Sequence, residues 1–163
     1  MEESWYAIYV KSRCEKKVFQ ELCKRNISGY LPLQKVTKQW SDRKKTVEIP
    51  LIHSYLFVHI NLLQYKNVLE IPGVVKFISF SEKAVAIPEK QIKGLEAVLA
   101  IATEVEIIDS VPSLGETILV SSGPFKGFYG KVTEGKKFKV IIQLDQIGYN
   151  VFVTIPLSYI GKD

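Results

Sequence analysis

The chain has 163 residues and a net charge of +5, with 47% hydrophobic and 24% charged residues. This composition excludes a disordered chain or a coiled coil, and the length suits one ordinary domain or two small ones. No apolar run approaches the roughly 20 residues of a membrane-spanning helix. The first residues, Met1 to Ser4, lack the features of a signal peptide. We therefore expect a mature cytoplasmic protein that makes no contact with a membrane.

The positive charge is concentrated at the amino-terminal end. Residues 1–50 hold eleven Lys/Arg against six Asp/Glu, whereas residues 101–163 hold six against seven. A basic stretch favours contact with phosphate groups, although a solvated basic face that aids solubility explains the same pattern.

The amino-terminal third predicts a strand, a helix and a hairpin. Residues 4–10 are aromatic or apolar at nearly every position, as in a buried strand. Residues 15–26 carry apolar side chains at helical spacing between charged ones, which indicates an amphipathic helix. Residues 30–40 and 46–49 flank the turn-forming group Ser41 to Lys44, which predicts a hairpin with a basic tip.

The middle third alternates strands with helices. Residues 55–60 form the strongest strand pattern, and Asn61 with Gln64 suits the cap of a short helix that ends near residue 70. Residues 74–80 and 84–87 read as two further strands, and a long helix follows Pro88 to about residue 103. This order predicts an α+β fold in which helices cover a mostly antiparallel sheet.

The last third predicts a second, helix-free domain. The pattern weakens over residues 104–111, which indicates a linker between a first domain at 1–103 and a second at 112–163. Short β-branched runs at 117–120, 130–133, 138–144 and 149–155 are separated by Gly, Pro and Asp, as in a small β-barrel.

No grouping of residues indicates catalysis. His53 and His59 have no further ligand at metal-binding spacing, and Cys14 and Cys23 are too far apart on one helix for a disulfide. The carboxylates are scattered, without a pair suited to acid–base chemistry. We therefore expect neither an enzyme nor a bound metal or cofactor.

Two basic clusters are candidate contacts for nucleic acid. The hairpin combines Trp40 with cationic side chains, which suits phosphate binding and base stacking. The cations of this segment are Lys35, Lys38, Arg43, Lys44 and Lys45. A second cluster, Lys11, Arg13, Lys16 and Lys17, follows the first strand. A solvated hairpin tip is an equally economical explanation of the first cluster.

Grouped aromatic residues are candidates for protein recognition. Tyr9, Tyr55, Phe57, Phe77 and Phe80 lie on expected strands of the first domain, where they either fill the core or line a groove for a partner's helices. The segment 123–130 places three further aromatics between closely spaced glycines. These rings form either an exposed contact or part of a thin core, and the sequence leaves both explanations open.

The order of several short motifs resembles the NusG family of transcription elongation factors. In the first domain the motifs are Trp5-Tyr6, Glu15-Lys16-Lys17-Val18, Pro50-Leu51, Tyr55-Leu56-Phe57-Val58, Pro72-Gly73-Val74 with Phe77, and Ile87-Pro88 with Gln91-Ile92. In the second domain Gly115, Val120, Gly123-Pro124-Phe125, Gly127-Phe128 and Gly130-Lys131-Val132 resemble a KOW motif. The resemblance implies a NusG amino-terminal (NGN) sandwich followed by a small SH3-like KOW barrel.

Within this family the chain is most similar to specialised antiterminators of the UpxY and RfaH type. The hairpin from Gln39 to Lys45 carries this similarity. General NusG proteins usually have Pro-Gly before the tyrosine, whereas His53-Ser54 precedes Tyr55 here. The resemblance implies a factor that suppresses pausing and termination on long operons, such as those for surface polysaccharides.

The resemblance also implies a polymerase-binding surface in the first domain. An apolar depression would hold the clamp helices of the largest RNA polymerase subunit. The residues that match this surface are Tyr9, Ile52, Tyr55, Phe57, Phe77 and Phe80.

Further contacts follow from the same resemblance. Lys11, Arg13 and Lys17 would face the non-template DNA strand, and the hairpin with Lys38, Trp40, Arg43, Lys44 and Lys45 would point toward upstream DNA. In the KOW domain, Phe125, Lys126, Phe128 and Tyr129 would contact a ribosomal protein. We expect a monomer. The alternative is a ribosome-associated or RNA-binding KOW protein, for which the second domain carries little positive charge.

Overall fold

The computed structural model describes residues 2–102, 104–108, 118–119, 126–133 and 137–156 of the chain. Contacts divide the chain into two compact units, Met1–Pro88 and Glu89–Asp163. We refer to them as the N-terminal and C-terminal units.

The N-terminal unit is built on a five-stranded antiparallel sheet. Its central strands are β1 (Ser4–Val10) and β5 (Tyr55–Ile60), which pair from Ser4 opposite Ile60 to Tyr9 opposite Tyr55. The short strand β2 (Ser28–Tyr30) flanks β5, and β6 (Val74–Phe77) and β9 (Ala86–Ile87) flank β1. The expected antiparallel sheet is confirmed.

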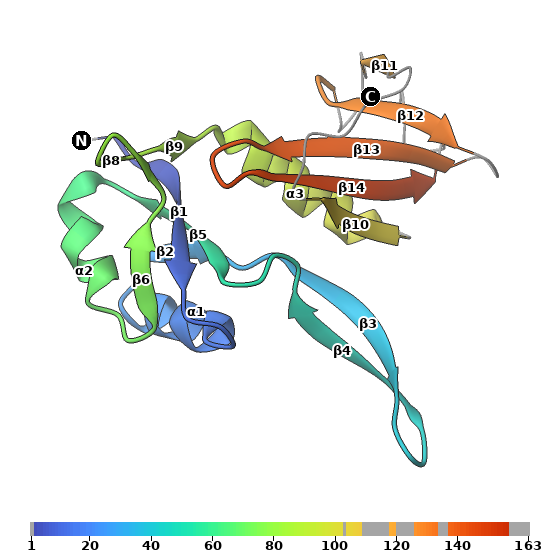
Figure 1. Ribbon diagram of the computed structural model, residues 1–163, viewed down its shortest axis with the longest axis horizontal. Coiled ribbons are helices and arrows are strands. Elements are labelled where there is room, and N and C mark those ends of the chain that lie inside the picture. Colours follow the sequence, from blue (N-terminus) through green and yellow to red (C-terminus); the bar gives the residue numbers. More distant parts are fainter. Residues whose placement is uncertain (1, 103, 109–117, 120–125, 134–136, 157–163) are drawn as a thin grey trace. The chain divides into compact units, whose positions relative to one another are not determined.

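One face of this sheet is covered by helices α1 (Glu15–Lys24) and α2 (Tyr65–Leu69) (Figure 1). Side chains of a strand alternate between faces, so Ile8 of β1 and Leu56 of β5 point toward the helices. They pack with Val18 and Leu22 of α1 and Val68 of α2, all fully buried. Each such side chain stabilises the fold by roughly 1.5–3 kcal/mol through its removal from water.

A long hairpin projects from this sheet (Figure 1). Strands β3 (Leu33–Gln39) and β4 (Lys44–Pro50) pair from Leu33 opposite Pro50 to Gln39 opposite Lys44. The backbone N–H of Trp40 donates to the Arg43 carbonyl oxygen over 2.8 Å and closes the turn. The hairpin expected from the sequence is confirmed.

The segment after β5 begins with a helix cap, as its sequence predicts. The Asn61 side chain accepts from the Leu63 N–H at 3.0 Å, and the Gln64 side chain accepts from the Asn61 N–H at 3.3 Å. This reciprocal cap starts the single turn η1 (Leu62–Gln64), which leads into α2. A small hairpin of β7 (Ser79–Phe80) and β8 (Lys83–Ala84) follows β6.

In the described part of the C-terminal unit, one helix accompanies a second antiparallel sheet. The helix α3 (Glu89–Ile101) packs against β13 (Lys137–Leu144) and β14 (Tyr149–Pro156). The sheet order is β10-β14-β13-β12-β11, with β10 at Glu104–Ile108, β11 at Ile118–Leu119 and β12 at Tyr129–Thr133. The strands expected at 130–133, 138–144 and 149–155 are confirmed.

The junction between the two expected domains differs from the sequence analysis. Residues 104–108, expected to start the linker, form strand β10 and pair with β14 from Glu104 opposite Thr154. Residues 109–111 lie outside the described residues. Helix α3, expected in the first domain, belongs by its contacts to the C-terminal unit. The alternation of Val105, Ile107 and Ile108 with glutamates suits a strand, a signal that the linker interpretation overlooked.

Several simpler properties can be read from the described residues. Cys14 and Cys23 are both free thiols. Within the described ranges, no three His, Cys, Asp or Glu residues are grouped so that they could hold a metal ion. Among the same residues no helix is both long enough and apolar enough to cross a bilayer.

Candidate functional site

The sheet face opposite α1 and α2 carries a row of paired aromatic rings. Because side chains alternate, this face is formed by Trp5, Ala7 and Tyr9 of β1 and by Tyr55, Phe57 and His59 of β5. The register places Trp5 opposite His59 with ring centroids 5.0 Å apart, and Tyr9 opposite Tyr55 with centroids 5.4 Å apart. Phe57 lies opposite the small Ala7 and stacks on Tyr30 of β2 at 6.3 Å. We call these rings the aromatic face.

The members of the aromatic face differ in accessibility. Tyr9 and Tyr55 are half-buried and meet edge to face, an arrangement that rings favour electrostatically. Phe57 and Ile52 are buried, with 0% and 2% of their surfaces exposed. Trp5, Tyr30 and His59 are half-buried as well, so these rings and the two tyrosines are all partly accessible, and the buried pair lies beside them.

The structure does not bring all six candidate polymerase-binding residues together. Phe77 lies on the helix-covered face, where its ring stacks on Tyr65 at 4.3 Å and meets Tyr6 at 6.3 Å. Its position on β6 opposite Ile8 fixes this direction. Phe80 is 78% exposed on the β7–β8 hairpin. Phe77 is thus a core residue, and Phe80 belongs to a separate surface.

Trp5, Tyr30 and His59 of the aromatic face were not among the residues predicted to bind a partner, although period-two alternation already places His59 on one face with Tyr55 and Phe57. Trp5 could have been found in the same way, because it shares a face with Tyr9. Tyr30 could not, because its place beside Phe57 depends on the register of β2 with β5.

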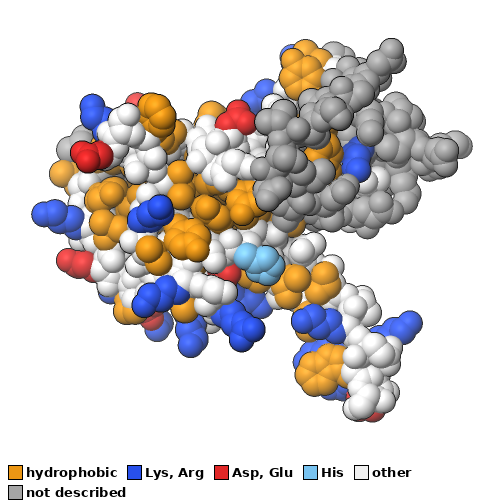
Figure 2. Space-filling view, in the orientation of Figure 1, with side chains coloured by type: hydrophobic (Ala, Val, Ile, Leu, Met, Phe, Trp, Pro, Cys, Tyr) orange, Lys and Arg blue, Asp and Glu red, His pale blue; other side chains and the backbone are white. Residues whose placement is uncertain are grey.

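The basic residues expected near DNA are exposed, and they occupy two places in the N-terminal unit. Lys11 and Arg13 lie in the turn between β1 and α1, and Lys17 lies in the first turns of α1. Arg13 has φ of +64°, a left-handed conformation that side-chain-bearing residues rarely adopt. Figure 2 shows basic side chains along this edge of the unit and along the hairpin.

The hairpin presents its cations together with an indole ring. Lys38 pairs with Lys45 across the two strands, and Arg43 and Lys44 lie beside the turn. The Lys45 ammonium lies 5.0 Å from the centroid of Trp40, which is 48% exposed. Such an arrangement can bind phosphate through the ammonium groups and a base through the indole.

In the C-terminal unit the expected contact loop is only partly accessible. Phe128 is 9% exposed because its ring lies against Gly94 of α3, where a Cβ atom would collide with it. The Lys90 ammonium lies 5.3 Å from the ring centroid. Tyr129 is 50% exposed, Lys126 is exposed, and Phe125 lies outside the described residues.

Glu21, near the end of α1, has a shifted pKa. The Lys24 ammonium donates to the Glu21 carboxylate over 2.6 Å, and this hydrogen bond together with the attraction of opposite charges lowers the pKa of Glu21. The pair lies on the solvent side of the helix.

Comparison with known proteins gives one family. The family profile described as "Transcription termination factor nusG" matches residues 3–96. A protein of Borreliella burgdorferi named "Transcription termination/antitermination protein NusG" is 24% identical over 188 aligned residues, which cover 99% of this chain and 100% of that protein. The Rickettsia felis protein of the same name is 25% identical over 143 residues, covering 81% of this chain and 74% of that protein.

A solved structure shows the same fold. The structure described as "Domain interaction in Thermotoga maritima NusG" superimposes with a TM-score of 0.57 over 98% of this chain and 96% of that chain, at 19% identity. The fold is therefore the α+β NGN arrangement followed by a small C-terminal β region, as the sequence analysis expects.

Proposed function

The chain belongs to the NusG family of transcription termination and antitermination factors, and from this premise we propose that it binds elongating RNA polymerase with its aromatic face and DNA with its basic hairpin. Proteins of this family act by binding and not by catalysis, so the chain is not an enzyme. Its effect would be to change the populations of elongating and paused polymerase.

The polymerase contact is assigned to the aromatic face, and the observation that carries this assignment is the Tyr9–Tyr55 pair. Two half-buried tyrosines meet edge to face on the two central strands of the sheet, with Phe57 and Ile52 buried nearby. Aromatic anchors held on a rigid element are the residues that dominate recognition surfaces. A partner helix laid across these rings would bury them fully, as expected for the clamp helices of the largest polymerase subunit.

The DNA contact is assigned to the hairpin and to the β1–α1 turn. In our proposal Lys38, Arg43, Lys44 and Lys45 bind phosphates of upstream DNA, and Trp40 supplies a stacking surface. Lys11, Arg13 and Lys17 face the non-template strand. None of the β3 and β4 residues is buried, so these side chains are available to a partner.

A specialised role on particular long operons, such as surface polysaccharide operons, is supported by the residues before Tyr55. Ser54 stands where general family members usually have glycine, and it keeps the left-handed backbone with φ of +67°. The Glu15 carboxylate, 4% exposed, accepts from the Ser54 N–H at 2.9 Å and holds this conformation. The chain therefore retains the turn that a glycine permits while presenting a different surface beside Tyr55.

A second partner, a ribosomal protein, is proposed for the loop of the C-terminal unit. Lys126 and Tyr129 are exposed and could bind directly, whereas Phe128 could contribute only if α3 released its ring. Phe125 belongs to the same proposal from the sequence alone.

A pull-down of purified core RNA polymerase tests the polymerase contact. We expect the wild-type chain to retain polymerase and the Tyr9→Ala/Tyr55→Ala variant to lose at least about tenfold in affinity, because two half-buried aromatic anchors are removed. Trp40→Ala serves as the matched control, since it removes an exposed ring from the hairpin and should bind polymerase normally. Failure of the wild-type chain to bind polymerase from its own host would contradict the proposal.

A further inference from the structure

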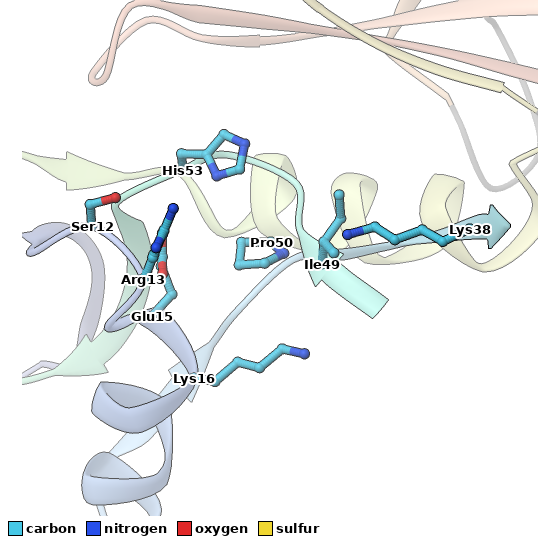
Figure 3. A pocket seen from close by; sticks show the side chains of 8 residues that line it. All are labelled: Ser12, Arg13, Glu15, Lys16, Lys38, Ile49, Pro50 and His53. Carbon is cyan, nitrogen blue, oxygen red and sulfur yellow. The ribbon is translucent and has the colours of Figure 1, made fainter. Parts of the chain in front are cut away.

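Glu15, the first residue of α1, is an acidic side chain that the fold buries. Only 4% of its surface is exposed, and it lies beside Arg13 in a cavity of about 550 Å³ at the base of the hairpin (Figure 3). A carboxylate that leaves water costs stability unless hydrogen bonds or opposite charges compensate. Among the described residues no lysine or arginine forms an ion pair with Glu15. Its hydrogen bond therefore indicates what this side chain does.

The Glu15 carboxylate holds the turn that leads into β5. The Ser54 N–H donates to Glu15 Oε1 over 2.9 Å, in a buried hydrogen bond between residues 39 positions apart. The Tyr55 N–H donates to the Ile52 carbonyl oxygen at 3.5 Å, which closes a turn with Ser54 as its third residue. Ser54 has φ of +67°, and a turn with a positive φ at its third residue usually has glycine there. The bond from Glu15 thus stabilises a backbone conformation that serine by itself disfavours.

The same turn fixes the start of β5 against β1. The Ser54 carbonyl oxygen accepts from the Val10 N–H at 2.8 Å, and the next residue, Tyr55, lies opposite Tyr9. The two rings meet edge to face, with centroids 5.4 Å apart and planes inclined by 71°. A change in the Ser54 backbone would break the bond to Val10 and turn the Tyr55 backbone with it. The geometry of the tyrosine pair therefore depends on the residue that Glu15 holds.

Glu15 is itself held in place because α1 is anchored in the core. Val18 and Leu22, three and seven residues further along, are fully buried against the sheet. These intervals follow the helical repeat, so Glu15 lies on the same buried side of α1. A group on a rigid helix positions its partner more accurately than a group on a loop does.

We propose that Glu15 is a positioning residue for polymerase binding, which keeps Tyr55 paired with Tyr9 through the Ser54 turn before the polymerase arrives. This proposal rests on the proposed function, which assigns the polymerase contact to these two tyrosines. A preformed pair binds more tightly, because the apparent affinity falls in proportion to the fraction of chains that hold the binding geometry. The buried Glu15 acts only through the turn and does not touch the partner.

Two substitutions at Glu15 separate its hydrogen bond from its charge. Glu15→Asp keeps a carboxylate at the start of the helix, where acidic residues are favourable, but is one methylene too short for the observed bond to Ser54. Glu15→Gln keeps the length and an acceptor oxygen while it removes the charge. Ser54→Gly, alone and combined with Glu15→Asp, provides a residue that adopts the left-handed backbone without help. Glu21→Asp is the matched control on α1, because the Glu21 carboxylate pairs with Lys24 on the solvent side.

Each variant is measured both in the free chain and with purified core RNA polymerase. The nuclear Overhauser effect between the Tyr9 and Tyr55 rings reports their pairing in the free chain. A titration gives the polymerase affinity, corrected for the folded fraction that denaturant unfolding provides. We expect Glu15→Asp to weaken the ring contact and to lower the affinity about tenfold, as a tenfold fall in the paired fraction predicts.

The other variants should separate the turn from the charge. Glu15→Gln should keep the ring contact and most of the polymerase affinity, and Glu21→Asp should leave both unchanged. In the Ser54→Gly background, Glu15→Asp should cost much less affinity than it does in the wild-type chain, because the turn no longer needs the hydrogen bond.

Full ring pairing and full polymerase affinity in Glu15→Asp would overturn the proposal, even if the variant is less stable. An equal loss of affinity in Glu15→Gln would assign the effect to charge. An undiminished loss from Glu15→Asp in the Ser54→Gly background would show that Glu15 does not act through the turn. A wild-type chain that fails to bind polymerase would contradict the proposed function, whereas the ring contact in the free chain would still test the role of Glu15.

Discussion

Two strand pairs of the N-terminal unit have the same antiparallel geometry and opposite surroundings. In the β1–β5 pair, β5 buries four of its six residues. In the β3–β4 pair no residue is buried. Hydrophobic packing therefore restricts which side chains the first pair can carry, whereas the fold places few such restrictions on the second pair. A hairpin freed from packing requirements can carry a stacking ring and several cations, which makes its sequence informative about function.

The largest expected effect tests this contrast directly. Leu56→Ala, at a fully buried position of β5, should lower the free energy of unfolding by about 2–5 kcal/mol because it leaves a cavity against Val18 and Leu22. Val47→Ala, on the hairpin, should cost less than about 1 kcal/mol. Denaturant unfolding measures the free energy of unfolding of both variants, and hydrogen exchange of the β1 amides gives a second measurement of it. Similar losses of unfolding free energy in the two variants would contradict this contrast between the two strand pairs.

A second test asks whether tight packing also governs the C-terminal unit. Gly94→Ala should destabilise this unit by about 1–3 kcal/mol, because the added methyl collides with the buried Phe128 ring. The usual gain of alanine over glycine in a helix, about 1 kcal/mol, works against this loss. Thermal unfolding measures the difference, with Glu96→Ala on the exposed side of α3 as the control. A stabilised Gly94→Ala chain would contradict the close contact.

A smaller effect is expected at the end of β5, where the buried sheet gives way to an exposed turn. Asn61→Ala should lower stability by about 1 kcal/mol because the side chain no longer accepts from the Leu63 N–H. Asn67→Ala is the matched control on α2, since only the backbone carbonyl of Asn67 accepts, from Arg25. The denaturant midpoint of Asn61→Ala should therefore be lower than that of Asn67→Ala. Equal midpoints would show that the cap contributes nothing.

The smallest expected effect lies on the solvent side of α1. The pKa of Glu21 is lowered by Lys24, so their attraction stabilises the folded chain above the ordinary carboxyl pKa and is lost as the pH falls through the lowered value. In Lys24→Gln the Glu21 pKa should return toward its ordinary value, as an NMR titration can follow. A carboxyl pKa that stays low in this variant would assign the shift to another cause.

Local pattern predicted the elements of this fold well. The alternation in β1 and β5, the cap at Asn61 and the turn at Ser41 to Lys44 are each determined by neighbouring residues, and each is confirmed. The start of the expected linker was wrong, because β10 is completed by pairing with β14, far along the chain. Long-range pairing leaves only a weak signal in the sequence.

The candidate site was harder to predict for the same reason. The choice of Tyr9 and Tyr55 as neighbours agrees with the observed register, but Phe77 points into the helix-covered core because of its pairing with β1. Phe128 is buried by a glycine on α3 that no local pattern connects to it. The basic residues of the hairpin are exposed, so their accessibility did not depend on long-range pairing.

We propose that two surfaces, the aromatic face and the hairpin, act together on transcribing polymerase. An elongation assay with purified polymerase through a pause site tests it most directly, with polymerase binding measured in the same samples. We expect Tyr9→Ala/Tyr55→Ala to lose both polymerase binding and pause suppression, whereas Arg43→Gln/Lys44→Gln/Lys45→Gln should keep polymerase binding and lose pause suppression. Full pause suppression by either variant, or no pause suppression by a wild-type chain that binds polymerase, would contradict a joint action of the two surfaces.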